Sequence, residues 1–298
     1  MLIRIGSRGS ALARWQAEHV QGRLAGLGHQ ATIHLITTTG DRVQDRRLEA
    51  VGGKGAFLKE IEEAMLAGEI DLAVHSLKDV PTALPPGLRL CAVLERADPR
   101  DALLSRAGLE LNKLPAGSRV GTTSLRRRAQ VAALRPDLVL QDLRGNVDTR
   151  IRKLCQGSCD AIVLAAAGLD RLGRRGEATE VLEPELFVPA PGQGAIALEC
   201  RQDDDAVAAV VAPLDHPPTA RAVAAERALL AGLRGGCNVP LGAYAVEDDG
   251  ALRLAAFVAR ADGSGVLRGQ VRDPDPQRAG AALAEQLIAR GAGELIRG

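Results

Sequence analysis

Arginine and hydroxyl side chains gather at three places where a short apolar run gives way to a helical pattern. These segments are Ser7-Arg8-Gly9-Ser10, Thr122-Thr123-Ser124-Leu125-Arg126-Arg127 and Leu143-Arg144-Gly145-Asn146. A single segment of this kind is explained by a helix N-cap beside a solvated arginine. Three of them favour a shared anion site, because a guanidinium group binds a carboxylate or phosphate through two parallel hydrogen bonds. The sequence therefore predicts a cleft for a ligand that carries several acidic groups.

Positive charge is concentrated in one stretch of a chain that is nearly neutral overall. The formal net charge is +1 over 298 residues, yet residues 119–153 contain nine Lys or Arg and only three Asp. Such a stretch attracts anions. Nucleic acid is not the expected partner, because aromatic residues for base stacking make up only 2% of the chain and the basic run Arg126-Arg127-Arg128 is short.

One carboxylate, Asp79, lies in a segment that could perform acid-base chemistry. The segment reads His75-Ser76-Leu77-Lys78-Asp79-Val80-Pro81 and follows an expected strand, with Pro81 stopping further regular structure. A carboxylate beside Lys78 and the arginines would stay ionised, and it could stabilise a developing cation or pass protons to a leaving amine. A surface Lys-Asp turn explains the position equally well, so the residues alone leave both interpretations open.

A glycine-rich stretch, Val51-Gly52-Gly53-Lys54-Gly55-Ala56-Phe57, resembles a phosphate-binding loop only superficially. It lacks the G-x-x-x-x-G-K-[ST] spacing and does not directly follow a strand. We expect a mobile loop there, whose Lys54 could add a positive charge at the cleft.

The chain has five cysteines, an odd number without dense spacing, so reduced thiols are expected rather than a disulfide framework. Cys91 and Cys200 lie in apolar runs and are expected to be inert core thiols. Cys155 and Cys159 have no histidine close by, so no metal site is expected. Cys237 follows two glycines in a tight loop near Arg234, which makes it a candidate nucleophile or a plain exposed thiol.

The elements that must position these residues alternate between strands and helices. Expected strands cover residues 2–5, 32–37, 71–75 and 88–94, then, after a polar crossover at 95–101, residues 119–121, 138–141 and 160–164. Expected helices cover residues 10–27, 56–66, 124–134 and 147–155, and the first should bury Leu12, Trp15, Val20, Leu24 and Leu27 on one face. This rhythm predicts two successive parallel α/β units.

The final third of the chain follows a different pattern. Residues 195–200 are expected to form one more strand, with which the chain could cross back to the first unit, and a helix is expected at 219–230. Three strands are then expected at 241–246, 252–259 and 265–271, before a helix that Asp275 and Pro276 begin and Gly291 ends.

Seven motifs occur in the order typical of one known family. They are Ser7-Arg8-x-Ser10-x-Leu12-Ala13-x-x-Gln16, Gly52-Gly53-Lys54-Gly55, His75-Ser76-x-Lys78-Asp79-Val80-Pro81, Ser124-Leu125-Arg126-Arg127, Leu143-Arg144-Gly145-Asn146-Val147-x-Thr149-Arg150, Pro191-Gly192-Gln193-Gly194-Ala195, and Glu226-Arg227 with Gly235-Gly236-Cys237-x-Val239-Pro240. The chain resembles the porphobilinogen deaminases through these motifs. It departs from them at Thr123, where the family often has serine, and at Ala50, where some members have lysine.

The resemblance implies an α/β fold of three domains. The first two resemble the two-lobed α/β units of periplasmic binding proteins, and the third is a small α+β domain that carries a cofactor cysteine. On this basis we expect an N-terminal domain of residues 1–95 and 195–213, a second domain of residues 100–190, and a C-terminal domain of residues 217–298.

The resemblance also implies an activity and a site. The enzyme would join four porphobilinogen molecules head to tail, with loss of ammonia, into hydroxymethylbilane, starting from a dipyrromethane primer bound through a thioether to Cys237. Asp79 would stabilise the cationic pyrroles. The cofactor- and substrate-binding residues would be Arg8, Ser10, Gln16, Lys54, Lys78, Ser124, Arg126, Arg127, Arg144, Arg150 and Arg171.

The expected partners and location follow partly from the residues and partly from the resemblance. The longest apolar stretch, residues 161–169, is too short to span a bilayer, and residues 1–9 have no apolar signal region, so no membrane partner and a cytoplasmic location are expected. The resemblance implies a monomer that passes its product to a uroporphyrinogen-III synthase. A non-catalytic anion receptor is the alternative, and it would need neither Asp79 nor a loop cysteine.

Overall fold

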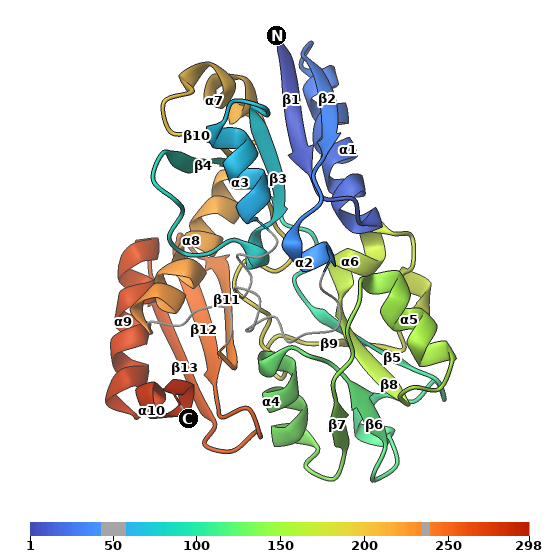
Figure 1. Ribbon diagram of the computed structural model, residues 1–298. Coiled ribbons are helices and arrows are strands. Elements are labelled where there is room, and N and C mark those ends of the chain that lie inside the picture. Colours follow the sequence, from blue (N-terminus) through green and yellow to red (C-terminus); the bar gives the residue numbers. More distant parts are fainter. Residues whose placement is uncertain (43–57, 234–238, 298) are drawn as a thin grey trace. The chain divides into compact units, whose positions relative to one another are not determined.

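The computed structural model describes residues 1–42, 58–233 and 239–297 (Figure 1). These residues form two compact units. The first consists of Met1–Ala97 and Gly194–Ala220, and the second of Asp98–Gln193 and Arg221–Gly298. Of the expected site residues, Lys54 and Cys237 lie outside the described residues, as does the glycine-rich loop.

A five-stranded sheet forms the centre of the first unit. Its order is β2 (Gln30–Leu35), β1 (Leu2–Ser7), β3 (Leu72–Ser76), β10 (Ile196–Arg201) and β4 (Leu88–Val93). β2, β1 and β3 run parallel, whereas β10 is antiparallel to both of its neighbours. The chain therefore returns from the second unit to complete this sheet, as the sequence predicts.

Helices cover both faces of this first sheet. Leu72 and Val74 of β3 share a core with α1 (Ala11–Gly26) and α7 (Asp205–Val211), whereas Ala73 packs with α3 (Lys59–Leu66). Burial on both faces explains why β3 is apolar at nearly every position. A short helix, α2 (Thr39–Arg42), follows β2.

The predicted apolar face of α1 is partly wrong. The buried positions are Gln16, Ala17, Val20 and Leu24, whereas Leu27 is 42% exposed. Trp15 is half-buried and stacks on His19 with ring centroids 5.1 Å apart. The core face thus runs through Gln16, Ala17, Val20 and Leu24, and Trp15 packs against its border.

The second unit contains a sheet of the same design. Its order is β7 (Val139–Gln141), β6 (Arg119–Gly121), β8 (Ala161–Ala165), β5 (Asp101–Ser105) and β9 (Glu180–Leu182). The first three strands run parallel, and β5 is antiparallel to β8 and β9. Sequence reasoning missed β5, which begins inside the expected polar crossover. The helices α4 (Leu125–Leu134), α5 (Val147–Cys155) and α6 (Ala166–Arg171) follow β6, β7 and β8.

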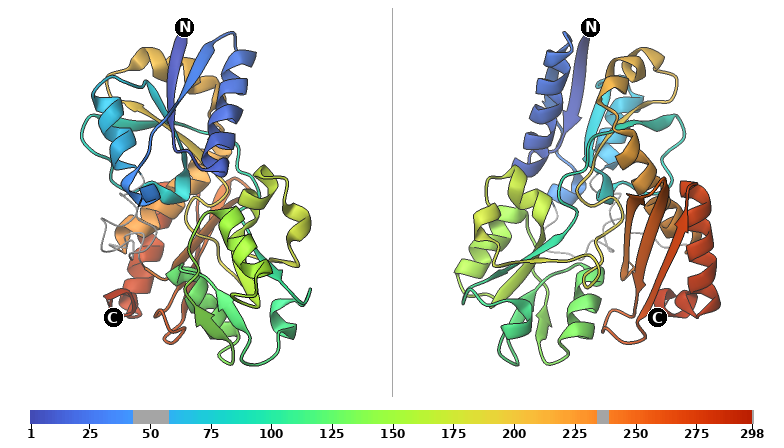
Figure 2. Two further views of the ribbon diagram at one scale, coloured as in Figure 1. Left: turned by 45° about the vertical axis from the view of Figure 1, so that its right-hand side comes forward. Right: turned by 180° about the vertical axis from the view of Figure 1, so that it is seen from behind.

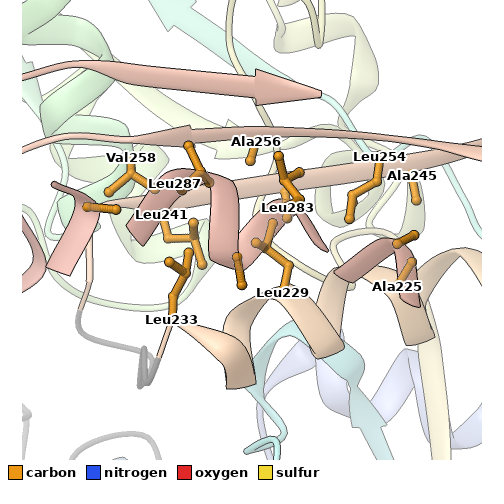
Figure 3. Packing of buried hydrophobic residues seen from close by; sticks show 14 of the residues in the cluster. Ala225, Leu229, Leu233, Leu241, Ala245, Leu254, Ala256, Val258, Leu283 and Leu287 are labelled. Atoms are coloured by element: carbon orange, nitrogen blue, oxygen red, sulfur yellow. The ribbon is translucent and has the colours of Figure 1, made fainter. Parts of the chain in front are cut away.

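The C-terminal part of the second unit is a small α+β layer. The antiparallel strands β11 (Leu241–Asp248), β12 (Ala251–Val258) and β13 (Leu267–Asp273) pack on α8 (Pro217–Gly232) and α9 (Pro276–Ala289). Leu229, Leu254, Leu283 and Leu287 meet in its core (Figure 3). Asp275 caps α9 with Pro276 at its first turn, as predicted, and α10 (Ala292–Arg297) follows after Gly291.

The predicted fold class is confirmed: two α/β sheets of like topology and a small α+β layer (Figure 2). The three domain boundaries at 1–95 with 195–213, 100–190 and 217–298 stay a prediction. Among the described residues, no helix is long and apolar enough to cross a membrane.

Candidate functional site

In the first unit, the expected site residues follow two neighbouring parallel strands. β1 and β3 pair directly, so their carboxyl ends lie at the same edge of the sheet. Arg8 and Ser10 follow β1, and Lys78 and Asp79 follow β3. Open α/β sheets bind ligands at this edge. The fold therefore brings these four residues to one end of one sheet.

Hydrogen bonds tie the two segments at this edge together. Gln16, which is buried on α1, donates from Nε2 to Ser76 Oγ over 2.8 Å. Ser10 caps α1 by accepting from the Ala13 amide over 3.3 Å, and Ser7 Oγ lies 3.1 Å from the Ala13 carbonyl oxygen. Gln16 thus links the first turns of α1 to the strand end that precedes Asp79.

The turn that carries Lys78 and Asp79 is held by its buried neighbours. It is a single 3-10 turn, Leu77–Asp79. Leu77 and Val80 are 1% and 2% exposed, and the Leu77 amide donates to the Ala195 carbonyl over 3.0 Å. Lys78 and Asp79 between them are half-buried. A carboxylate on a turn anchored at both ends has a restricted position, which general acid-base catalysis requires.

A buried histidine–glutamate hydrogen bond lies on the strand that leads into this turn, and sequence reasoning gave it no role. His75 Nε2 of β3 and Glu199 Oε2 of β10 are 2.9 Å apart, and both side chains are buried. Burial, followed by the nearby Glu199 charge, raises the pKa of Glu62 on α3. The pairing spans 124 positions of sequence, so no local pattern could have revealed it.

In the second unit, two helices begin with side-chain caps at the carboxyl ends of parallel strands. Ser124 caps α4 by accepting from the Arg127 amide over 3.4 Å. Asn146 caps α5 by accepting from the Thr149 amide over 2.9 Å. The remaining amide groups at such helix N-termini favour anions.

Arg126 and Arg127 are almost wholly buried and share one carboxylate. Arg127 donates from Nε and Nη2 to Asp101 Oδ1 over 2.9 and 2.7 Å, and Arg126 Nη1 lies 2.7 Å from Asp101 Oδ2. Arg126 also donates to the Val188 carbonyl over 2.7 Å. Asp101 is 0% exposed, and Gln193 donates to it over 3.1 Å. Sequence reasoning missed Asp101 because it treated residues 95–101 as a linker.

Arg144, Arg150 and Arg171 lie in the segments that follow β7 and β8. Arg150 donates from Nε to the Gly145 carbonyl over 2.8 Å, which fixes the loop between β7 and α5. Gly145 has φ 120°, and a Cβ there would lie 2.5 Å from Thr149, so this position requires glycine. Arg171 ends α6, and its burial lowers the pKa of its guanidinium to about 10.

A buried glutamate organises the helix that leads toward Cys237. Glu226 of α8 is 0% exposed, and its two oxygens accept from the Gly192 and Ala245 amides over 2.7 and 2.8 Å. It therefore connects α8 with β11 and with the Pro191-Gly192-Gln193-Gly194 turn. This carboxylate gives the Glu226-Arg227 motif a structural role within the second unit.

Replacing Asp101 by asparagine should destabilise the second unit. The change keeps the size of the side chain but leaves two buried guanidinium groups without their shared charge, which costs about 3 to 5 kcal/mol. Urea denaturation followed by circular dichroism measures this loss. Asp142→Asn is the matched control, because Asp142 is exposed and pairs with Arg128 over 3.2 Å. Equal stability of the two variants would contradict the importance of the buried carboxylate.

Comparisons with known proteins cover nearly the whole chain. A model described as "Porphobilinogen deaminase, dipyromethane cofactor binding domain" matches residues 3–209, and one described as "Porphobilinogen deaminase, C-terminal domain" matches residues 220–289. The chain belongs to the porphobilinogen deaminase family. A porphobilinogen deaminase of Geobacter metallireducens is 50% identical over 99% of this chain and 93% of its own length. One of Thiobacillus denitrificans is 51% identical over 97% of this chain and 96% of its own length.

Solved structures resemble the chain only distantly. A putative lipoprotein from Actinomyces odontolyticus is 15% identical, covers 70% of this chain and 87% of its own, and gives a TM-score of 0.43. An ancestral arginine-binding protein bound to arginine is 14% identical, covers 72% of this chain and 90% of its own, and gives a TM-score of 0.40. These likenesses are too weak to support an argument.

Family membership confirms the activity expected from the motifs. As a porphobilinogen deaminase, the chain is a transferase of tetrapyrrole biosynthesis, a hydroxymethylbilane synthase, and its cofactor is dipyrromethane. The roles of individual side chains in that reaction remain predictions.

Proposed function

We propose that Asp79 is the catalytic carboxylate of this deaminase and that Cys237 anchors its dipyrromethane. The observation that carries the proposal is the convergence of Arg8, Lys78 and Asp79 at one edge of the first sheet. This edge combines cationic groups for the carboxylates of porphobilinogen with one carboxylate for its reacting amine. An anion receptor would need only the cationic groups.

The second unit offers what an acidic cofactor requires. Dipyrromethane carries acetate and propionate groups, and it supplies the primer from which the chain of pyrroles grows. Within residues 1–42, 58–233 and 239–297, Asp101 is the carboxylate that pairs with both Arg126 and Arg127. A further carboxylate close to them would improve this charge balance. The residues present therefore fit the cofactor, and we assign its acidic groups to Ser124, Arg126 and Arg127.

Asp79 acts on the substrate when ammonia leaves. As the C–N bond of porphobilinogen breaks, positive charge develops on the pyrrole ring, and a fixed carboxylate stabilises that charge. Deprotonation of the ring after the new C–C bond has formed needs a base, and the same carboxylate can accept that proton. The anchored turn between Leu77 and Val80 keeps Asp79 in place through both steps.

The remaining predicted residues would hold substrate carboxylates. On the first unit they are Arg8, Ser10, Gln16 and Lys78, and on the second Arg144, Arg150 and Arg171. Gln16 already donates to Ser76, so we assign it to positioning the Ser76–Asp79 segment rather than to substrate contact alone. Lys54 belongs to this proposed set although it lies outside the described residues.

Assay of the purified chain with porphobilinogen tests the proposed function directly. We expect stoichiometric release of ammonia and formation of hydroxymethylbilane. Intact mass spectrometry should show a chain heavier by one dipyrromethane, and peptide mapping should place it on Cys237. A chain that binds porphobilinogen without releasing ammonia would overturn the assignment of Asp79 and favour the receptor.

Replacing Arg171 by leucine should separate binding from stability. Arg171 is half-buried and its burial lowers the pKa of its guanidinium, so we expect the loss of this charge to weaken substrate binding more than the fold. Loss of a charge-assisted bond worth about 1.5 to 3 kcal/mol should weaken substrate binding on the order of tenfold or more. KM and denaturation curves measure both effects. Arg152→Leu, at an exposed position of α5, controls for net charge. A less stable Arg171→Leu with normal KM would indicate a structural arginine.

We further propose that the enzyme is a cytoplasmic monomer that passes its product to a uroporphyrinogen-III synthase. Cysteines without a disulfide spacing pattern support a reducing compartment. Light scattering during size-exclusion chromatography tests the monomer. A faster conversion of bilane when the synthase is added before rather than after the deaminase reaction would support hand-over.

A further inference from the structure

Two cysteines that the sequence places 109 positions apart come together on neighbouring strands of the first unit. Cys91 lies on β4 and Cys200 on β10, and these strands pair antiparallel. The pairing shifts between Leu198 and Glu199, so that Cys91 is the extra residue of a bulge. A bulge redirects the side chain of the extra residue. Cys91 therefore packs into the same core as Cys200, on the face that α1 and α7 cover.

The Cys91 side chain reaches the strand that carries Cys200. Cys91 Sγ lies 3.4 Å from the Leu198 carbonyl oxygen, two residues before Cys200 on the partner strand. The two thiols are close enough for each to shift the pKa of the other. Cys200 is fully buried, whereas Cys91 is partly exposed. In the strand register Cys200 lies opposite Arg89, so a disulfide between the two thiols depends on the bulge turning Cys91 toward Cys200.

We propose that Cys91 and Cys200 are a redox-active pair, which a hydroperoxide converts into a disulfide in the folded enzyme. This pair is distinct from Cys237, the proposed cofactor anchor. This proposal assigns a modification site to two residues that the sequence predicts to be inert core thiols.

Charges around the pair favour Cys200 as the attacking sulfur. The neighbouring Cys91 thiol lowers the pKa of the Cys200 thiol, burial opposes this, and the Arg89 guanidinium lowers the pKa further. Arg89 lies opposite Cys200 in the strand register and pairs with Asp205 over 2.7 Å. Asp204 is the nearby charge that raises the pKa of Cys200. The neighbouring Cys200 thiol and burial raise the pKa of Cys91, which stays a thiol.

The oxidation proceeds in two balanced steps. The Cys200 thiolate attacks one peroxide oxygen, the O–O bond breaks, and the other oxygen leaves and takes a proton to give water or an alcohol. Cys91 then attacks the Cys200 sulfenic sulfur, the S–S bond forms, and the hydroxide that leaves combines with the Cys91 proton as water. The two sulfurs lose two electrons together, and the peroxide gains them. A dithiol reductant reverses the reaction by exchange.

The disulfide would join β4 and β10. Each of these strands lies next to a segment where the chain passes from one unit to the other. β4 continues to Ala97 and β10 begins after Gly194, and the Ala97 amide donates to the Gly194 carbonyl over 3.1 Å. A covalent bond between β4 and β10 closes a long loop and reduces the conformational entropy of the unfolded chain. The oxidised first unit should therefore resist denaturation better than the reduced one.

Peptide mapping after peroxide treatment tests the pair. The test uses the primed full-length chain with Cys155→Ser, because Cys155 is an exposed thiol on α5 that would react on its own. Trypsin places Cys91 in the peptide 90–96 and Cys200 in the peptide 176–201. After hydrogen peroxide, alkylation and digestion, we expect these two peptides joined, the loss of both free thiols, and recovery of both with a dithiol.

Two further measurements make the outcome decisive. Cys91→Ala in the same background should leave Cys200 without a disulfide and abolish the increase in urea midpoint on oxidation. After peroxide treatment in urea, the Cys91–Cys200 disulfide should no longer be preferred over other pairings, because β4 and β10 are no longer paired in the unfolded chain. Alkylation of both cysteines in the treated native chain, or a link from either one to Cys159 or Cys237, would overturn the proposal.

Discussion

Asp79→Asn should lower the rate of ammonia release by about 10² to 10⁴ while the fold is retained. The substitution keeps the shape of the side chain and removes the negative charge that we assign to stabilising the cationic pyrrole. The fold should survive because the buried residues of this turn are Leu77 and Val80, whereas Asp79 is only half-buried. Ammonia and bilane are measured at saturating porphobilinogen, with circular dichroism as the folding control.

Two companion variants sharpen this prediction. Asp79→Glu retains the charge but displaces it, so its rate should lie between those of wild type and Asp79→Asn. Asp205→Asn changes an exposed carboxylate of the same unit, which pairs with Arg89, and should leave turnover unchanged. If Asp79→Asn kept a rate within a few-fold of wild type, the catalytic carboxylate would have to be another residue.

Cys237→Ser should abolish activity by preventing attachment of the primer. A thioether forms through a soft sulfur nucleophile, and the serine hydroxyl does not replace it under mild conditions. The intact mass of the variant should equal that of the bare chain. Cys155→Ser, which alters the exposed thiol of α5, should keep both the cofactor mass and the activity. Normal turnover by the Cys237→Ser chain would move the anchor to a different cysteine.

Local signals predicted much of the fold. The helix predicted at 147–155 is found at those bounds, and Asn146 caps its first turn. β6 likewise covers the expected residues 119–121. β5 was missed because it is short and begins with Asp101, a residue type that is rare in strands. Its strand geometry comes from pairing with β8 and β9, which no local pattern encodes.

The sequence predicts which residues form the site better than it predicts the contacts that these residues make. Family motifs gave Gln16, although the apolar pattern of α1 would have placed it outside the core. They also gave Arg126 and Arg127 as ligands for carboxylates. Their buried partner Asp101 depends on tertiary structure. For the same reason the Cys91 and Cys200 pair could not be inferred, because strand order decides which thiols meet.

The position of β10 has a consequence for synthesis on the ribosome. β4 pairs only with β10 among the described strands, and β10 ends at residue 201, more than a hundred residues after β4. The sheet from β5 to β9 needs only residues 101–182 and can close earlier during translation. We therefore expect the sheet of the second unit to form first during translation. The N-terminal sheet should form later, because it lacks β10 until the middle of the chain has been made.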